Sequence, residues 1–70
     1  MTQEFTVRDM SCGHCAQAIT KEVQGVHGVE TVKVDVNTKR VSVEANEQVT
    51  TDIIVNAINE AGYADITVLN

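Results

Sequence analysis

The pattern of apolar residues predicts an α+β sandwich, with one four-stranded antiparallel sheet and two helices on one of its faces. Four short runs alternate apolar and polar residues, which is the period of a β-strand. Two longer runs space apolar residues three or four positions apart, the period of an amphipathic helix. The runs follow one another in the order β-α-β-β-α-β, which is the split pattern of ferredoxin-like sandwiches.

In the first part of the chain we expect a strand over residues 3–8 that turns Phe5 and Val7 inward. A loop over residues 9–14 follows, and then a helix over residues 15–24. Apolar side chains recur along that helix and just beyond it, so one stripe faces the core. The stripe consists of Cys15, Ile19, Val23 and Val26.

Three further strands are expected over residues 29–36, 40–45 and 64–69. The first two form a hairpin, because only residues 37–39 separate two alternating runs. The resulting core comprises Phe5, Val7, Ile19, Val23, Val32, Val34, Val36, Val41, Val43, Ile54, Ile58, Ile66 and Val68. The polar alternates are expected on a solvated opposite face: Arg8, Lys33, Asp35, Arg40, Ser42 and Glu44.

The second helix is expected to start at Thr50 or Thr51, with Asp52 in its first turn, and to stop at Gly62. Its inward stripe is Ile54, Ala57, Ile58 and Ala61. Following the chain up and down through this topology places the loop at 9–14, the turn at 37–39 and Gly62-Tyr63 at one end. Tyr63 is therefore expected beside the loop at 9–14.

Size and charge restrict the function. Seventy residues make a single domain over 1–70 with a formal charge of −5. Nucleic acid is not expected as a partner, because phosphate contacts need clustered Lys and Arg. No apolar run has the length of a membrane span, so no membrane insertion is expected. These features favour a cytoplasmic protein, where two close cysteines indicate metal binding or catalysis rather than a structural disulfide.

Both cysteines of the chain, Cys12 and Cys15, lie in one C-x-x-C motif between the first strand and the first helix. The unpaired N–H groups and the partial positive charge at a helix start favour thiolate over thiol. Two thiolates on a short loop suit a thiophilic ion such as Cu(I), Zn(II) or Hg(II). The cysteine pair is therefore the candidate metal site.

The motif Met10-Ser11-Cys12-Gly13-His14-Cys15, in this β-α-β-β-α-β setting, resembles the heavy-metal-associated domain family. The helix residues Ile19 and Val23 and the late pair Gly62-Tyr63 extend the resemblance over nearly the whole chain, most closely to bacterial copper chaperones. One position departs, since Asp9 stands where the family usually has glycine.

The resemblance implies a non-enzymatic carrier that binds Cu(I) through Cys12 and Cys15. Its implied partner is a copper-transporting P-type ATPase, through that enzyme's own similar domains. Two alternatives stay open: a carrier of Zn(II) or another divalent ion with Asp9 as an oxygen ligand, and a domain of an ATPase itself. The starting methionine, Met1, favours a free protein.

A third alternative is a thiol-disulfide oxidoreductase, because Cys-Gly-His-Cys is also the active-site tetrapeptide of protein disulfide isomerases. Enzymes of the thioredoxin fold are longer, place a cis-proline opposite the cysteines and usually have tryptophan before the first one. This chain contains no proline and no tryptophan, and Ser11 precedes Cys12. The metal carrier is therefore the preferred interpretation.

Four nearby or chemically similar residues have weaker claims. Met10 could add a third sulfur ligand, but core packing is preferred at a strand–loop junction. His14 is expected in solvent; the minority interpretation makes it a bridging ligand in a metal-linked homodimer. Tyr63 is either a turn residue or, as the resemblance implies, a shield over the metal. His27 is expected at the opposite end as an ordinary loop residue.

Overall fold

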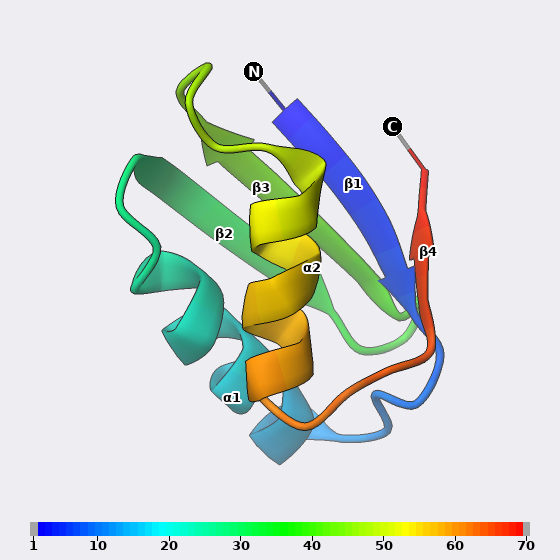
Figure 1. Ribbon diagram of the computed structural model, residues 1–70. Helices are drawn as coiled ribbons and strands as arrows, with labels where there is room; N and C mark the ends of the chain where they lie inside the picture. Colours follow the sequence, from blue (N-terminus) through cyan, green and yellow to red (C-terminus); the bar gives the residue numbers. More distant parts are fainter. Residues whose placement is uncertain (1, 70) are drawn as a thin grey trace.

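A computed structural model describes residues 2–69 and confirms the predicted sandwich. The sheet has the strand order β2-β3-β1-β4, and all three neighbouring pairs are antiparallel. Figure 1 shows both helices packed on the same face of this sheet. The elements are β1 (Thr2–Val7), α1 (Gly13–Gln24), β2 (Val29–Asp35), β3 (Arg40–Ala45), α2 (Thr51–Glu60) and β4 (Ile66–Val68). Met1 and Asn70, the ends of the expected 1–70 domain, lie outside the described residues.

The core lies between the two central strands and the helices. Alternate residues of β1 and β3 are buried, because these strands have a neighbour on either side and helices above. The fully or nearly buried apolar side chains are Phe5, Val7, Met10, Ile19, Val23, Val41, Val43, Ala45, Val49, Ile54, Ala57 and Ile58. Residues of the edge strand β2, such as Val32 and Val34, are only half-buried. The predicted core residues of the central strands and the helices are thus confirmed, whereas burial at the edges of the sheet was overestimated.

The last strand corrects two expectations. We expected a strand over residues 64–69, but β4 spans only Ile66–Val68. Val68, expected in the core, is 47% exposed. It pairs with Phe5 and so projects toward the helix-covered side of the sheet, but β4 is an edge strand with no neighbour on its outer side. Alternation in the sequence indicates the side of the sheet toward which a side chain projects, but it does not show whether other elements cover that side chain.

Polar groups and a close packing contact join the two loops near the chain termini. Gln3, a buried polar residue of β1, donates from Nε2 to the Val49 carbonyl at 2.9 Å and accepts from Thr51 Oγ1 at 3.2 Å. Gly28, with a φ of +99°, lies so close to Asn46 and Val49 that an added Cβ would be 2.8 Å from Val49 Cγ2. The backbone N–H of Asn46 donates to the Gly28 carbonyl at 3.0 Å. This end of the sandwich is closed.

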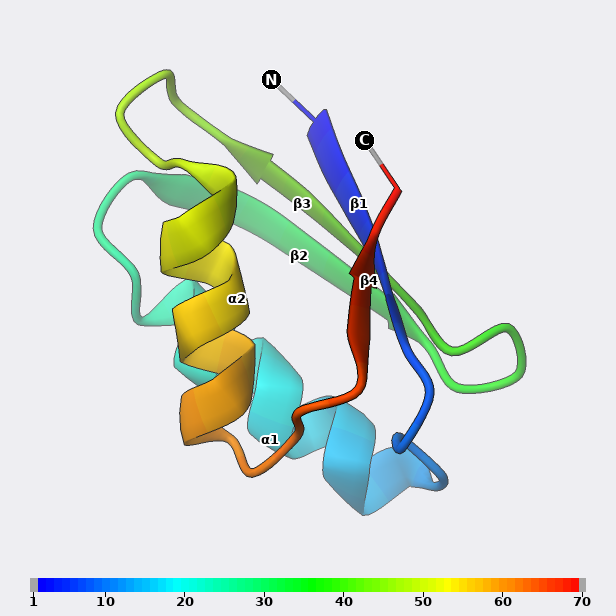
Figure 2. The same ribbon diagram turned by 45° about the vertical axis from the view of Figure 1, so that its right-hand side comes forward.

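The opposite end gathers three loops, as the topology predicts. The N–H of Val7 donates to the Lys39 carbonyl at 2.8 Å, and that of Arg8 donates to the Asp65 carbonyl at 2.9 Å. Figure 2 shows the start of α1 and the α2–β4 connection next to each other at this end, away from both termini. Neither helix described between residues 2 and 69 has the length and apolar character that a membrane span requires.

Candidate metal centre

The cysteine loop leaves β1 at Val7 and enters α1 two residues earlier than expected. The helix was predicted to begin at Cys15, but it begins at Gly13, and Cys12 is its N-cap residue in extended conformation (φ −156°, ψ 174°). The Cys12 carbonyl accepts the first helical hydrogen bond, from the Ala16 N–H at 3.2 Å. Cys15 consequently lies in the first helical turn rather than at its start.

The two sulfur atoms lie next to each other at this helix start. The Cys12 and Cys15 Sγ atoms are 3.5 Å apart, both thiols are free, and Ser11 Oγ is 4.0 Å from Cys15 Sγ. Cys12 is exposed and Cys15 is half-buried against the core. The Cys12 side chain makes no capping hydrogen bond, so the N–H groups of the first turn keep their unpaired character. The pair is open to solvent on one side and supported by packed helix on the other.

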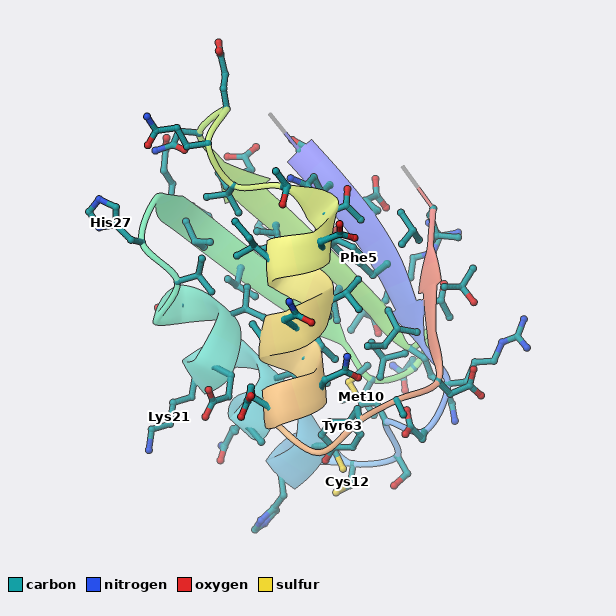
Figure 3. The ribbon with its side chains drawn as sticks, in the orientation of Figure 1. Phe5, Met10, Cys12, Lys21, His27 and Tyr63 are labelled. Carbon is teal, nitrogen blue, oxygen red and sulfur yellow. The ribbon has the colours of Figure 1, made fainter. Side chains whose placement is uncertain are left out.

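Tyr63 reaches the cysteines because of how α2 ends. Gly62 adopts a φ of +102°, its N–H donates to the Asn59 carbonyl at 2.9 Å, and the Tyr63 N–H donates to the Ile58 carbonyl at 3.4 Å. This pair of bonds is the Schellman ending of a helix, in which glycine supplies the left-handed residue. The chain turns there toward the start of α1, and Figure 3 shows the Tyr63 side chain beside that of Cys12. The prediction that Tyr63 adjoins the cysteine loop is confirmed.

The interaction between the Tyr63 and Cys15 side chains shifts the pKa of both. Hydrogen bonding with the Tyr63 side chain, and then with the Ser11 backbone and the Cys12 thiol, lowers the pKa of Cys15 to about 6. The Cys15 thiolate in turn raises the pKa of Tyr63 to about 12, since ionising the phenol would remove the hydrogen bond and place two negative charges together. At neutral pH, Cys15 is therefore a thiolate and Tyr63 a neutral donor, so one soft anionic ligand is already formed.

The base of the cysteine loop is held from two sides. Asp9 Oδ2 accepts the backbone N–H of Ala64 at 3.1 Å, which joins the loop to the α2–β4 connection. Lys39 donates from Nζ to the Arg8 carbonyl at 3.1 Å, which joins it to the β2–β3 hairpin. Residues 8 and 9 are thereby fixed, whereas the exposed tip with Ser11 and Cys12 is open to solvent.

The other residues considered for the metal site lie in different environments. Met10 is fully buried and belongs to the core, as the packing interpretation predicted. His14 is exposed, and His27 lies at the far end of the molecule (Figure 3). Among residues 2–69, no group of three or more Cys, His, Asp or Glu side chains is arranged to hold a metal. Asp9, the oxygen ligand of the divalent-ion alternative, accepts the Ala64 N–H in this structure.

Comparison with known proteins now identifies the family. The heavy-metal-associated domain family matches residues 4–64. The chain belongs to this family. The resemblance seen in the sequence is therefore confirmed, and the match includes the cysteine loop, both helices and Tyr63.

Relatives of two kinds are similar to this chain. The copper chaperone CopZ of Enterococcus hirae is 46% identical over 66 residues, which cover 90% of this chain and 93% of that protein. The copper-transporting ATPase 2 of Rhizobium meliloti is 30% identical over 64 residues, which are 91% of this chain but only 8% of the ATPase. A chain in the solution structure of the Atx1–Cu(I)–Ccc2a complex superimposes with a TM-score of 0.85 at 25% identity, covering 99% of this chain and 94% of that one.

Sequence reasoning missed two features of this site. It treated Asp9 only as a departure from the family pattern and a candidate ligand, whereas its carboxylate accepts a backbone hydrogen bond from a residue 55 positions away. It also placed Cys12 in the loop rather than at the N-cap. No sequence signal marks Cys12 as the N-cap, because cysteine is not among the residues preferred there and its extended conformation is known only from the structure. No local signal indicates the Asp9 contact, because its partner is a main-chain group.

Proposed function

We propose that the protein is a copper chaperone that carries one Cu(I) ion between the thiolates of Cys12 and Cys15. The observation that carries the proposal is the pair of free sulfurs, 3.5 Å apart, at an uncapped helix start in a heavy-metal-associated domain. Soft thiolates favour Cu(I), and the absence of a further ligand group among residues 2–69 suits an ion that accepts two ligands. A tetrahedral structural zinc site would need four ligands.

The site needs only a small adjustment to accept the ion. With the ~2.3 Å distance typical of zinc–thiolate bonds as a guide, a metal held linearly between two thiolates places the sulfurs about 4.6 Å apart. The present separation is 3.5 Å, and Cys12 is exposed enough to rotate outward. Cys15, fixed in the helix and already ionised, is the ligand that stays in place.

Transfer follows from the open side of the pair. A partner's thiolate adds to the bound Cu(I) to give a three-sulfur intermediate, and the bond to one of the chain's own sulfurs then breaks. Copper stays Cu(I) throughout, and each thiolate released takes up a proton according to its pKa. Only metal–sulfur bonds form and break, so the proposed protein is a carrier and not an enzyme.

For the partner we propose a copper-transporting P-type ATPase with domains of this same fold, in the cytoplasm. Support comes from the similarity of this one chain both to a free chaperone and to a small part of an ATPase. The similar fold in a Cu(I) complex between two proteins supports transfer from one such domain to another. A metal-linked homodimer through His14 stays the minority interpretation, and no contact of that residue favours it.

The test is to load the reduced protein with Cu(I), Zn(II) and Co(II) in turn against a competing chelator, and to measure bound metal by native mass spectrometry. We expect one tightly held Cu(I) per chain and loss of both divalent ions at the same chelator concentration. Retention of Zn(II) in preference to Cu(I) would establish the divalent carrier instead. Multiple-turnover isomerisation of scrambled disulfides, beyond that of a simple dithiol, would establish the oxidoreductase.

A further inference from the structure

Asp9 joins two segments that are remote in sequence and meet at the metal site. Its Oδ2 accepts the Ala64 N–H at 3.1 Å, and Ala64 directly follows Tyr63. Beside this bond, the Arg8 N–H donates to the Asp65 carbonyl at 2.9 Å. The carboxylate therefore holds the main chain on the carboxyl side of the tyrosine whose ring adjoins the cysteines.

Besides the packing of its ring against the core, Tyr63 is held near the cysteine loop by the link through Asp9. Its own N–H is used within the end of α2, where it donates to Ile58, and so does not hold it to the cysteine loop. Within the described chain, two hydrogen bonds join residues 8–9 to residues 64–65: the Asp9 carboxylate accepts the Ala64 N–H, and the Arg8 N–H donates to the Asp65 carbonyl. No residue beyond its chain neighbours and the adjoining helix backbone lies within 4 Å of where a Cβ of Gly62 would stand, so the glycine itself adds no packing contact to the turn.

We propose that Asp9 is a positioning residue: its carboxylate holds the α2–β4 connection so that Tyr63 stays against Cys15, and this slows the escape of bound metal. The part that concerns metal escape rests on the proposed Cu(I) function, whereas the part that concerns Tyr63 does not. Asp9 acts here through a backbone hydrogen bond and not as a metal ligand.

The metal-free protein provides the first test. Tyr63 is the only tyrosine and the chain has no tryptophan, so intrinsic fluorescence reports on this one ring. In Asp9→Ala we expect stronger quenching by acrylamide and amide exchange at Ala64 faster by about fivefold, the ratio that corresponds to a hydrogen bond of about 1 kcal/mol. Asp9→Asn should resemble the parent, because its amide oxygen can still accept the Ala64 N–H.

A charge control and a second readout complete the experiment. Glu60→Ala removes an exposed negative charge at the end of α2 and should change neither quenching nor Ala64 exchange. With Cu(I) bound, Asp9→Ala should lose metal to a chelator several-fold faster than the parent, Asp9→Asn and Glu60→Ala.

The outcomes separate the two proposals. Unchanged exchange and quenching in Asp9→Ala would overturn the positioning role, and so would an Asp9→Asn variant that behaves like the alanine variant. Altered exchange and quenching with unaltered metal release would overturn its effect on metal escape. A parent protein that fails to bind Cu(I) would refute the carrier function, while the metal-free measurements would still decide whether Asp9 positions Tyr63.

Discussion

The two helices begin in opposite ways. At the start of α2, Thr50 is the N-cap, its hydroxyl accepts the Ile53 N–H at 3.4 Å, and Asp52 adds a negative charge in the first turn. At the start of α1, Cys12 is the N-cap, no side chain caps the helix, and the first turn has no acidic residue. A missing cap costs about 0.5–2 kcal/mol, and a free helix start attracts anions. The start of α2 therefore favours stability, whereas the start of α1 leaves its N–H groups open next to the two sulfur atoms.

The same contrast extends to the two ends of the sandwich. Near the termini, loops are closed by the Gln3 hydrogen bonds and by the close approach of Gly28 to Asn46 and Val49. At the cysteine end, hydrogen bonds fix the base of the loop through Asp9 and Lys39 and leave the sulfur atoms accessible. The contacts that close one end and the sulfur atoms proposed to bind metal at the other end therefore come from different segments, and four predictions compare the two ends.

The largest effect is expected from removing a sulfur. Cys15→Ser should weaken Cu(I) binding by at least about 100-fold, because even the outer partners of a metal ligand are worth about 10–100-fold in affinity. Below about pH 6, where the Cys15 thiol is protonated in both the folded and the unfolded protein, the melting temperature of the metal-free protein should change little. Chelator competition measures the affinity, and Ser11→Ala, which keeps both sulfurs, is the control. Parent-like affinity in Cys15→Ser would contradict the two-thiolate site.

At the closed end, Gly28→Ala should lower the free energy of unfolding by about 2–3 kcal/mol, because a left-handed residue with a Cβ is strained and the new atom meets Val49. Gly62→Ala is matched to it, with a φ of +102° but an open surrounding, and should cost about 1 kcal/mol. Urea unfolding measures both changes. Equal losses in the two variants would show that the close packing at Gly28 does not matter.

Substitutions at the two N-cap residues should change the stability of the metal-free protein in opposite directions. Thr50→Ala should destabilise the protein by about 1 kcal/mol, whereas Cys12→Ser should stabilise the metal-free protein by about 0.5–1 kcal/mol, because a serine hydroxyl accepts the N–H that the thiol leaves unpaired. Thermal unfolding of both variants without metal measures this. Cys15→Ser, inside the first turn, is the control and should show no such gain. A Cys12→Ser variant less stable than the parent would show that the missing side-chain cap at the start of α1 does not reduce stability.

The smallest effect is a pH dependence at the site. The pKa of Cys15 is about 6 in the folded protein, below its ordinary value of 9.0. Between these values the unfolded chain binds more protons, so the free energy of unfolding should rise with pH from about 6 to about 9, and this contribution is lost as the pH falls through about 6. Urea unfolding across this range measures the slope. Tyr63→Phe should flatten it, and an unchanged slope in that variant would contradict the Tyr63–Cys15 interaction.

Local patterns in the sequence were sufficient to predict the order of the elements and the place of the candidate site. Period-two and helical patterns are local, and they were sufficient to predict all six elements within a few residues at each end. The C-x-x-C motif is equally local, since both candidate ligands lie within four consecutive residues. Tyr63 could be placed beside them because consecutive elements that alternate in direction bring the loop at 9–14 and Gly62-Tyr63 to the same end of the sandwich.

Tertiary structure decided whatever depends on neighbours from distant parts of the chain. Val68 alternates correctly but is exposed, because it lies on an edge strand. Burial of Val49 depends on the β3–α2 loop folding back toward Gly28. The pairing of Asp9 with Ala64 leaves no trace in composition or spacing, because the partner is a backbone N–H that every residue except proline carries. Side-chain patterns can be read from the sequence, whereas contacts with main-chain groups form only when the chain folds.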